Sequence, residues 1–226
     1  MLTRQRAVLT PAELQRCRSV LEAADWVDGR ATAGRQSANA KHNQQLPEGS
    51  TGAAAMGDLV LEALRRHAGF IAAALPLKVF PPLFSRYQPG MAFGAHIDNA
   101  VRFAPDGGRY RTDLACTLFL SDPAAYDGGE LAIEDSFGER KVKLPAGDMV
   151  LYPATSVHRV EPVTRGERCA AFFWVQSMVR SDEQRTLLHG MDGAIASARA
   201  SLSDDHPAVI ALTGAYHNLI RMWAEL

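Results

Sequence analysis

The stretch Asp148–Gln176, DMVLYPATSVHRVEPVTRGERCAAFFWVQ, decides the fold class of this chain. Short runs rich in Val, Leu, Phe and Tyr alternate in it with Pro and Gly, the pattern of short β-strands joined by turns. The same texture begins near Leu77. The predicted strands are Val79–Tyr87, Phe93–Asp98, Thr112–Leu120, Glu130–Glu134, Arg140–Leu144, Asp148–Tyr152, Val157–Val163 and Arg168–Gln176. This number and spacing favour a double-stranded β-helix (jelly roll) over alternating strands and helices.

The segments on either side of these strands are predicted to be helical. Thr10, Pro11 and Glu13 form a capping box that starts a helix, and a second helical pattern covers Gly57–Ala74. Ser181 and Gln184 form another capping-box pattern. We therefore expect a mainly β, α+β protein with an N-terminal mainly helical support region at 1–76, a jelly-roll core at 77–180 and a C-terminal helical extension at 181–226.

The last predicted helix begins after Asp204-Asp205, with Pro207 in its first turn. One apolar stripe runs along it: Val209, Leu212, Tyr216, Leu219, Ile220 and Trp223. A stripe at this spacing is typical of a helix that buries one face. We expect it to pack against the barrel, with a homodimer interface as the alternative.

The segment Asp28–Gly57 is rich in Gly, Ala, Ser, Asn and Gln and has the composition of a loop. Two interpretations stay open at this point. It is either a linker or an ordered segment near the active site, because long loops inside compact domains are often functional.

The composition is that of an ordinary globular protein. Of 226 residues, 47% are hydrophobic, and 24 Lys and Arg oppose 25 Asp and Glu, which gives a net charge of -1. The apolar fraction excludes disorder of the whole chain. The near-neutral charge provides no broad basic field, so no nucleic-acid partner is expected.

The cysteines and the apolar segments indicate the compartment. Cys17, Cys116 and Cys169 are far apart and form no C-x-x-C, which argues against a disulfide framework or a thiolate zinc site and for a reducing environment. The N-terminus has no apolar signal core, and the longest apolar stretch, Ala68–Leu77, is too short to span a bilayer. We expect a cytoplasmic protein without membrane contact.

Two histidines stand apart from the other five. His96 and Asp98 are two residues apart on a predicted strand, so their side chains point to one face and can bind one metal ion. His158 begins a late strand, which a jelly roll can bring close to an early one. Two His and one carboxylate with open positions form the facial triad of non-haem Fe(II) oxygenases, although the same ligands could hold a zinc ion.

Arg168 lies ten residues after His158, at the start of an apolar strand. A buried guanidinium requires an anion, because an unpaired buried charge is expensive. A salt bridge to Glu161 or Glu167 is the structural alternative. A guanidinium near the metal suits a dicarboxylate co-substrate that is held at one end while its other end chelates iron.

The sequence resembles the PKHD-type hydroxylases, members of the prolyl-4-hydroxylase-like branch of the 2-oxoglutarate/Fe(II) dioxygenases. The matching stretches are Tyr87–Gly90 (YQPG), Gly94–Arg102 (GAHIDNAVR), Arg111–Glu130 (RTDLACTLFLSDPAAYDGGE), Lys143–Pro153 (KLPAGDMVLYP), His158, Pro162–Arg180 (PVTRGERCAAFFWVQSMVR) and Leu212–Glu225 (LTGAYHNLIRMWAE). The resemblance covers most of the chain. It implies that His96, Asp98 and His158 bind Fe(II) and that Arg168 binds the distal carboxylate of 2-oxoglutarate.

The resemblance also implies the reaction: hydroxylation of a substrate C–H with O2, release of succinate and CO2, and support by L-ascorbate. Tyr87 and Thr117 are candidates for contacts with 2-oxoglutarate, whereas Phe119 lies where some relatives have a hydrogen-bonding tyrosine. Asn99 and Arg102 lie where a substrate could reach them, or they fix a loop. The substrate is a peptidyl residue, an amino acid or a small metabolite.

Two other functions stay open on the residues alone. One is a cupin-like metal-dependent dioxygenase or lyase that does not use 2-oxoglutarate, which would leave Arg168 unexplained. The other is a sensing module that holds iron or 2-oxoglutarate without turnover.

Overall fold

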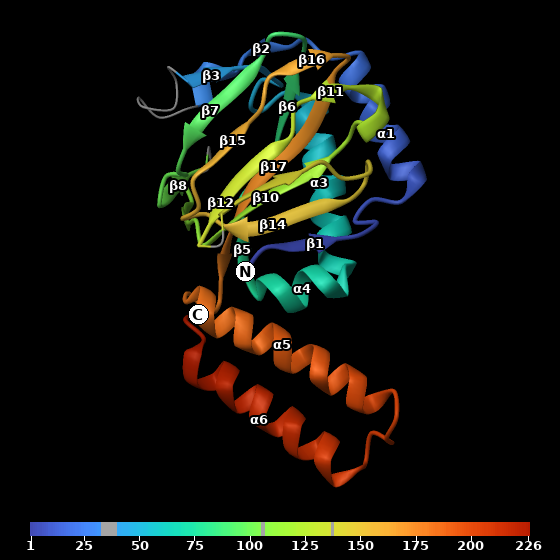
Figure 1. The fold of residues 1–226 in the computed structure, drawn as a ribbon, viewed down its shortest axis with the longest axis vertical. Helices are drawn as coiled ribbons and strands as arrows, with labels where there is room; N and C mark the ends of the chain where they lie inside the picture. Colours follow the sequence, from blue (N-terminus) through green and yellow to red (C-terminus); the bar gives the residue numbers. More distant parts are fainter. Residues whose placement is uncertain (33–39, 105–106, 137) are drawn as a thin grey trace.

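The computed structural model describes residues 1–32, 40–104, 107–136 and 138–226. Its centre is a jelly roll of two antiparallel sheets that face each other (Figure 1). The larger sheet has the order β1 (Thr3–Gln5), β14 (Met149–Pro153), β10 (Leu114–Phe119), β17 (Arg168–Ser177), β6 (Leu83–Tyr87), β4 (Gln44–Gln45) and β2 (Val27–Asp28), and β5 (Pro76–Val79) also pairs with β17.

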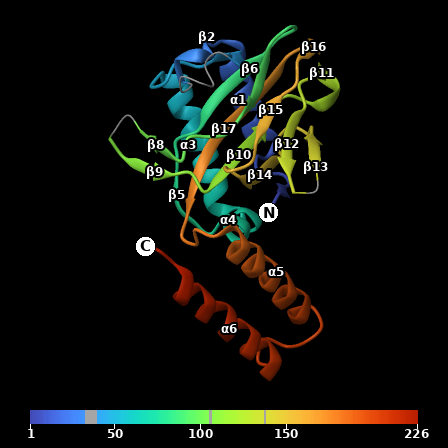
Figure 2. The ribbon, with the colours of Figure 1, turned by 60° about the vertical axis from the view of Figure 1, so that its left-hand side comes forward.

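The smaller sheet carries the strands that matter most for the site. Its order is β13 (Gly138–Val142), β12 (Leu131–Asp135), β15 (His158–Val160), β7 (Ala92–His96) and β3 (Lys41–His42). Two short ribbons complete the described β-structure: β8 (Val101–Phe103) with β9 (Arg109–Arg111), and β11 (Asp127–Gly128) with β16 (Val163–Arg165). Figure 2 shows the β8–β9 hairpin projecting from the barrel.

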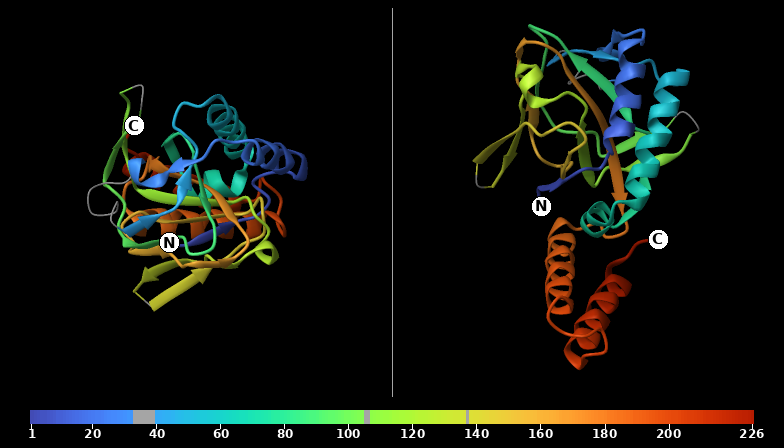
Figure 3. Two further views of the ribbon diagram at one scale, coloured as in Figure 1. Left: turned by 90° about the horizontal axis from the view of Figure 1, so that it is seen from above. Right: turned by 90° about the vertical axis from the view of Figure 1, so that its right-hand side faces the viewer.

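Strand β17 separates two hydrophobic cores, because successive side chains of a strand point to opposite faces. Trp174 and Phe172 face the barrel interior, while Phe173 faces the helices. The outer core is closed by α1 (Pro11–Glu22), α3 (Thr51–Arg66) and α4 (Ala68–Ala74), which cover the larger sheet (Figure 3). The alternation of apolar side chains in this strand therefore leaves the inner face for the site.

Helix α1 begins as predicted. The Thr10 hydroxyl accepts from the Glu13 amide, and the Glu13 carboxylate accepts from the Thr10 amide. The second helical prediction is correct in its end at Ala74 but wrong in its start, since α3 begins at Thr51, and it missed the interruption at His67. The His67 ring accepts from the Phe70 amide and so caps α4.

Prolines divide two of the predicted strands. Pro81-Pro82 breaks Val79–Tyr87 into β5 and β6, and Pro162 separates β15 from β16. Proline has no N–H for a ladder hydrogen bond, so a run of apolar residues around it makes two short strands instead of one. Strand β1, which the sequence did not reveal, pairs with β14.

The segment 28–57 is structured where it is described. Strand β3 pairs with β7 and β4 pairs with β6, so this one segment contributes to both sheets. Residues 33–39 lie outside the described residues. The described part supports the interpretation of an ordered segment and not that of a linker.

The C-terminal residues form a hairpin of α5 (Asp182–Arg199) and α6 (Pro207–Trp223) that extends away from the barrel (Figures 1 and 3). Ser181 caps α5: its hydroxyl accepts a hydrogen bond from the backbone N–H of Gln184 and donates one to the Glu183 carboxylate. The side chain of Gln184, the predicted partner in the capping box, takes no part in this cap. The last helix starts with Pro207, as predicted.

The apolar stripe of α6 is only partly covered by the barrel. Its C-terminal members, among them Trp223, pack on Leu75 and Val179 at the barrel base and on Leu188 of α5. Leu212 is exposed. The expectation of packing against the barrel is therefore correct at the end of the helix and wrong along its length, where α5 is the neighbour.

No helix in the described part of the chain combines the length and the apolar character needed to cross a bilayer.

Candidate active site

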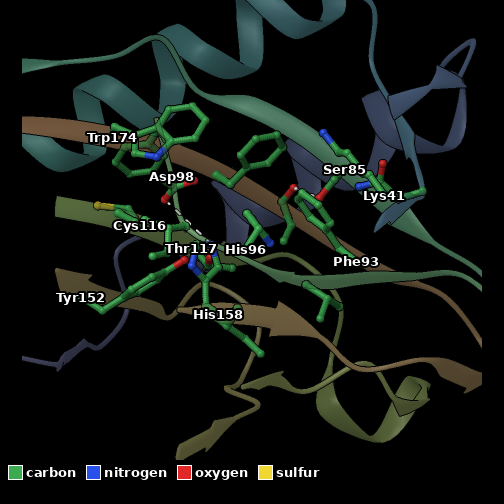
Figure 4. A pocket seen from close by; sticks show the side chains of 18 of the residues that line it. Lys41, Ser85, Phe93, His96, Asp98, Cys116, Thr117, Tyr152, His158 and Trp174 are labelled. Atoms are coloured by element: carbon green, nitrogen blue, oxygen red, sulfur yellow. Dashed lines mark hydrogen bonds and ion pairs between the residues drawn. The ribbon is translucent and has the colours of Figure 1, made fainter. Parts of the chain in front are cut away.

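The antiparallel pairing of β7 with β15 places His96 directly opposite His158. The centroids of the two imidazole rings are 4.2 Å apart. Asp98 follows the end of β7, and its Oδ2 lies 3.9 Å from Nε2 of His158 (Figure 4). One ligand atom from each of the three residues lies within 4.8 Å of the others. Residues 60 positions apart in the sequence thus form one group of the size that a single metal ion requires.

Backbone carbonyls orient both imidazole rings. Nδ1 of His96 is 2.8 Å from the Gly94 carbonyl oxygen, and Nδ1 of His158 is 3.1 Å from that of Ser156. A carbonyl only accepts, so each Nδ1 carries the proton and each Nε2 keeps a lone pair for a metal. Burial and the neighbouring His158 lower the pKa of His96 to about 4, which keeps that ring neutral near pH 7.

Arg168 is a buried cation that has no carboxylate partner in the described part of the chain. Its side chain is 2% exposed, and its Cζ lies 5.3 Å from the ring centroids of both Tyr87 and Phe119. Among the described residues its Nε has no hydrogen-bond partner. Glu161 pairs with Lys141 and Arg159, and Glu167 pairs with Arg86, so the structural salt bridge that the sequence left open is wrong. The geometry leaves room for an external anion.

Gly129 makes room for Arg168 and for two of its neighbours. Its φ is +65°, and a Cβ there would lie 2.9 Å from Cγ2 of Val163 and 3.1 Å from both Cδ of Arg168 and Cε2 of Tyr126. Any side chain at this position is strained by the backbone and also presses on these three residues.

Tyr87 and Thr117 both line the pocket with the triad. Tyr87 lies opposite Arg168 in the β6–β17 register, and burial raises the pKa of its hydroxyl, which therefore stays protonated. Thr117 points inward from β10, as Figure 4 shows next to His158. Phe119 has no hydroxyl to offer, and its ring instead covers the Arg168 guanidinium.

Sequence reasoning missed other residues that line the pocket. Lys41 and Asn43 come from the segment 28–57, Tyr152 from β14 and Trp174 from β17. The Lys41 ammonium lies 5.3 Å from the ring centroid of Phe93, and burial together with the nearby Arg102 charge lowers the pKa of Lys41 to about 8. Only the composition of the loop hinted at its place in the site.

The donor set fits a ferrous ion with a dicarboxylate co-substrate. Two imidazoles and one carboxylate are the protein ligands of the facial triad, and Arg168 supplies a buried cation that pairs with no carboxylate of the described residues.

Comparison with known proteins decides the family. A PKHD-type hydroxylase from Methylobacterium nodulans is 60% identical over 227 residues, which is all of both chains, and one from Methylobacillus flagellatus is 57% identical over the full length of both. The chain belongs to the PKHD-type hydroxylase family. The model of the 2OG-Fe(II) oxygenase superfamily matches residues 82–176 of this hydroxylase, and that of the PKHD-type hydroxylase C-terminal domain matches 182–225.

Solved structures share the fold of this PKHD-type hydroxylase. A Pseudomonas putida prolyl-4-hydroxylase aligns with a TM-score of 0.50 and 23% identity, over 78% of this chain and 92% of the other. HygX from Streptomyces hygroscopicus, solved with nickel, 2-oxoglutarate and hygromycin B, aligns with a TM-score of 0.53 and 16% identity, over 76% and 81%. At these identities the likeness concerns the fold.

The family membership identifies the chemistry. The PKHD-type hydroxylase is a 2-oxoglutarate/Fe(II)-dependent dioxygenase whose partners are 2-oxoglutarate, O2 and a substrate, and ascorbate is typical of the family. This favours the hydroxylase over the cupin-like enzyme and the sensing module that the residues alone left open.

Proposed function

We propose that His96, Asp98 and His158 hold the ferrous ion of this hydroxylase and that Arg168 binds the distal carboxylate of 2-oxoglutarate. The single observation that carries this proposal is the cross-strand pair of His96 and His158 beside Asp98, in a pocket that also contains Arg168, which pairs with no carboxylate of the described residues. When bound, the iron with 2-oxoglutarate and O2 supplies the oxidation of a substrate C–H, with succinate and CO2 as co-products.

The protein's own residues bind and orient the reactants. The carbonyls of Gly94 and Ser156 keep the two imidazoles turned so that Nε2 faces the pocket. Arg168 meets a carboxylate with a fork of N–H donors in a site from which water is largely excluded, where such a pair is strong. Tyr87 and Thr117 line the pocket, and their hydroxyls would donate hydrogen bonds to the co-substrate.

The proposal extends to the division of the chain, the class of substrate and the location of the enzyme. Residues 77–180 serve as the catalytic core, with 1–76 as support and 181–226 as an extension, which agrees with where the two family models match. The substrate is a small molecule or a peptidyl residue, and the enzyme works in the cytoplasm. The near-neutral charge argues against a nucleic acid as partner. A homodimer would use the exposed side chains of α6, such as Ile210 and Met222.

The decisive experiment is an anaerobic titration of the Fe(II) protein with 2-oxoglutarate, followed by visible spectroscopy. A weak charge-transfer band is expected in the wild type and is expected to be absent in Asp98→Ala. The control is Asp135→Asn, which changes a carboxylate on β12 that pairs with Arg140 and does not belong to the triad. A band of normal strength in Asp98→Ala would contradict the ligand assignment.

Mass spectrometry can then find the substrate. Cell extract incubated with enzyme, Fe(II) and 2-oxoglutarate should yield a product that carries one additional oxygen atom, and this product should be absent with His96→Ala.

A further inference from the structure

The pocket contains a second arginine, Arg102, which the reaction with 2-oxoglutarate does not use. It lies on β8, with its Cζ 4.0 Å from the Trp174 ring centroid and 5.2 Å from that of Phe80. Stacking on aromatic rings fixes the plane of a guanidinium but satisfies none of its N–H donors. In the described part of the chain, the buried Nε of Arg102 has no hydrogen-bond partner.

Trp174 adds a second unsatisfied donor at the same place. Its side chain is 5% exposed, and its Nε1 has no partner among the described residues. Figure 4 shows Trp174 next to Asp98, on the side of the triad away from Lys41. A buried indole N–H usually has an acceptor. Two donors without acceptors therefore lie together beside the metal ligands.

The charges of the pocket point the same way. Its charged lining consists of Lys41, Arg102 and Arg168 against the single carboxylate of Asp98, as far as the described residues go. A divalent iron and a dianionic 2-oxoglutarate cancel each other, and Asp98 balances one of the three basic side chains, so the described lining of the loaded pocket keeps a net positive charge. Asp98 and Glu48 both act on Lys41 and Arg102, and Asp28 acts on Lys41, but Asp28 and Glu48 do not line the pocket.

The two arginines are too far apart to bind one co-substrate. Arg168 and Trp174 are six residues apart on β17, which corresponds to about 20 Å along a strand. A 2-oxoglutarate that chelates iron and reaches Arg168 extends away from Trp174. Arg102 is therefore available to the molecule that is hydroxylated.

We propose that Arg102 and the Trp174 indole N–H form a subsite for a carboxylate of the substrate, so that this hydroxylase acts on an anionic substrate. The proposal rests on the proposed function, because it takes the Arg168 end as the 2-oxoglutarate site. The guanidinium fork matches a carboxylate in two-point contact, and the positive charge of Lys41 favours entry of an anion.

The test measures binding near the metal without turnover. The protein is loaded with Mn(II) in place of iron and with saturating 2-oxoglutarate, and the fluorine NMR relaxation of trifluoroacetate is recorded, with neutral trifluoroethanol for comparison. We expect the paramagnetic ion to broaden trifluoroacetate much more than trifluoroethanol. In Arg102→Gln the excess broadening should fall roughly tenfold, because one charge-assisted contact is lost. Arg102→Lys should retain part of it.

Arg109→Gln is the matched control, since Arg109 belongs to the same hairpin but stacks on the exposed Phe103. It should broaden trifluoroacetate like the wild type. Equal broadening of the two probes in the wild type, or undiminished broadening in Arg102→Gln, would overturn the proposal. A wild type that binds Mn(II) but shows no 2-oxoglutarate binding would instead overturn the proposed function.

Fractionated cell extract identifies the source of the carboxylate. Extract is split by size and passed over an anion exchanger before incubation with the enzyme. We expect the oxygenated product to arise from the bound fraction, either from small acids or from acidic peptides. A product that arises from the unbound fraction alone contradicts an anionic substrate.

Discussion

The two ends of the pocket differ in how they hold their arginines. Arg168 lies on the ten-residue β17 in the middle of the larger sheet, fully buried between two rings. Arg102 lies on the three-residue β8 in a two-stranded hairpin, half-buried, beside the exposed Phe103. A central strand of a large sheet is held by two neighbours, whereas an isolated ribbon has marginal stability. We call the Arg168 side the closed end of the pocket and the Arg102 side its open end. The rigid closed end suits a co-substrate that is the same in every turnover, and the open end can adapt to a substrate.

The largest effect is expected between the two ends, at the metal. His158→Ala removes a ligand on which both halves of the reaction depend, so succinate formation should fall by more than about 1,000-fold. The measurement is succinate release with saturating 2-oxoglutarate. His217→Ala, an exposed histidine of α6, should be unaffected. Substantial turnover by His158→Ala would contradict the assignment of His158 as a ligand of the iron between the two ends of the pocket.

Arg168→Gln tests the closed end. Loss of a charge-assisted contact to the distal carboxylate should raise the KM for 2-oxoglutarate roughly 10- to 100-fold. The metal content after loading should stay near one Fe(II) equivalent, because the three ligands are intact. Steady-state kinetics and metal analysis check the two statements, and an unchanged KM would contradict the role of Arg168.

Gly129→Ala acts on the same end indirectly. The left-handed backbone conformation costs a non-glycine residue about 1 kcal/mol, and the new Cβ presses on Arg168. We expect lower stability and a several-fold higher KM for 2-oxoglutarate. Gly90→Ala is the control, since its φ is +86° but a Cβ there meets nothing within 4 Å. Urea unfolding of the two variants measures the backbone strain, and the KM for 2-oxoglutarate measures the displacement of Arg168. Equal KM values for Gly129→Ala and Gly90→Ala would argue against a displacement of Arg168.

The smallest effect is expected at the open end. Phe103 is 66% exposed on β8, so Phe103→Ser should change the free energy of unfolding by less than about 0.5 kcal/mol and leave the KM for 2-oxoglutarate unchanged. Urea unfolding checks this. A loss above 1 kcal/mol would show that the hairpin is as rigid as the closed end.

Local rules predicted the parts of the fold that local interactions stabilise. The capping box at Thr10 and the start of α6 at Pro207 depend on residues within one helical turn, so the sequence suffices. The predicted strand bounds were wrong at Pro81-Pro82 and at Pro162. The apolar composition there favoured one long strand, but proline lacks the N–H that a sheet hydrogen bond needs. Strand β1 was missed because three residues carry too little pattern, and its partner β14 lies far along the chain.

The candidate site divides in the same way. His96 and Asp98 were recognisable together from their spacing on a predicted strand, although β7 ends at His96 and Asp98 lies just beyond it. Arg168 was recognisable because a charge interrupts an apolar strand. Lys41 could not be recognised from the sequence, because it lies neither at such a spacing nor in an apolar strand but in a segment with the composition of a loop. Trp174 was recognisable only as a barrel residue, because its unpaired N–H depends on which neighbours surround it.

The sequence by itself determined the chemical types available: two imidazoles, a carboxylate and a guanidinium within a series of short strands. The tertiary structure alone decided their meeting, because the β7–β15 register sets His96 against His158 across 62 positions of chain. It also decided that Arg168 pairs with no carboxylate among the residues that the structure describes, and that Arg102 shares the pocket. Contacts between distant residues depend on strand pairing and packing, which no local pattern of residues encodes.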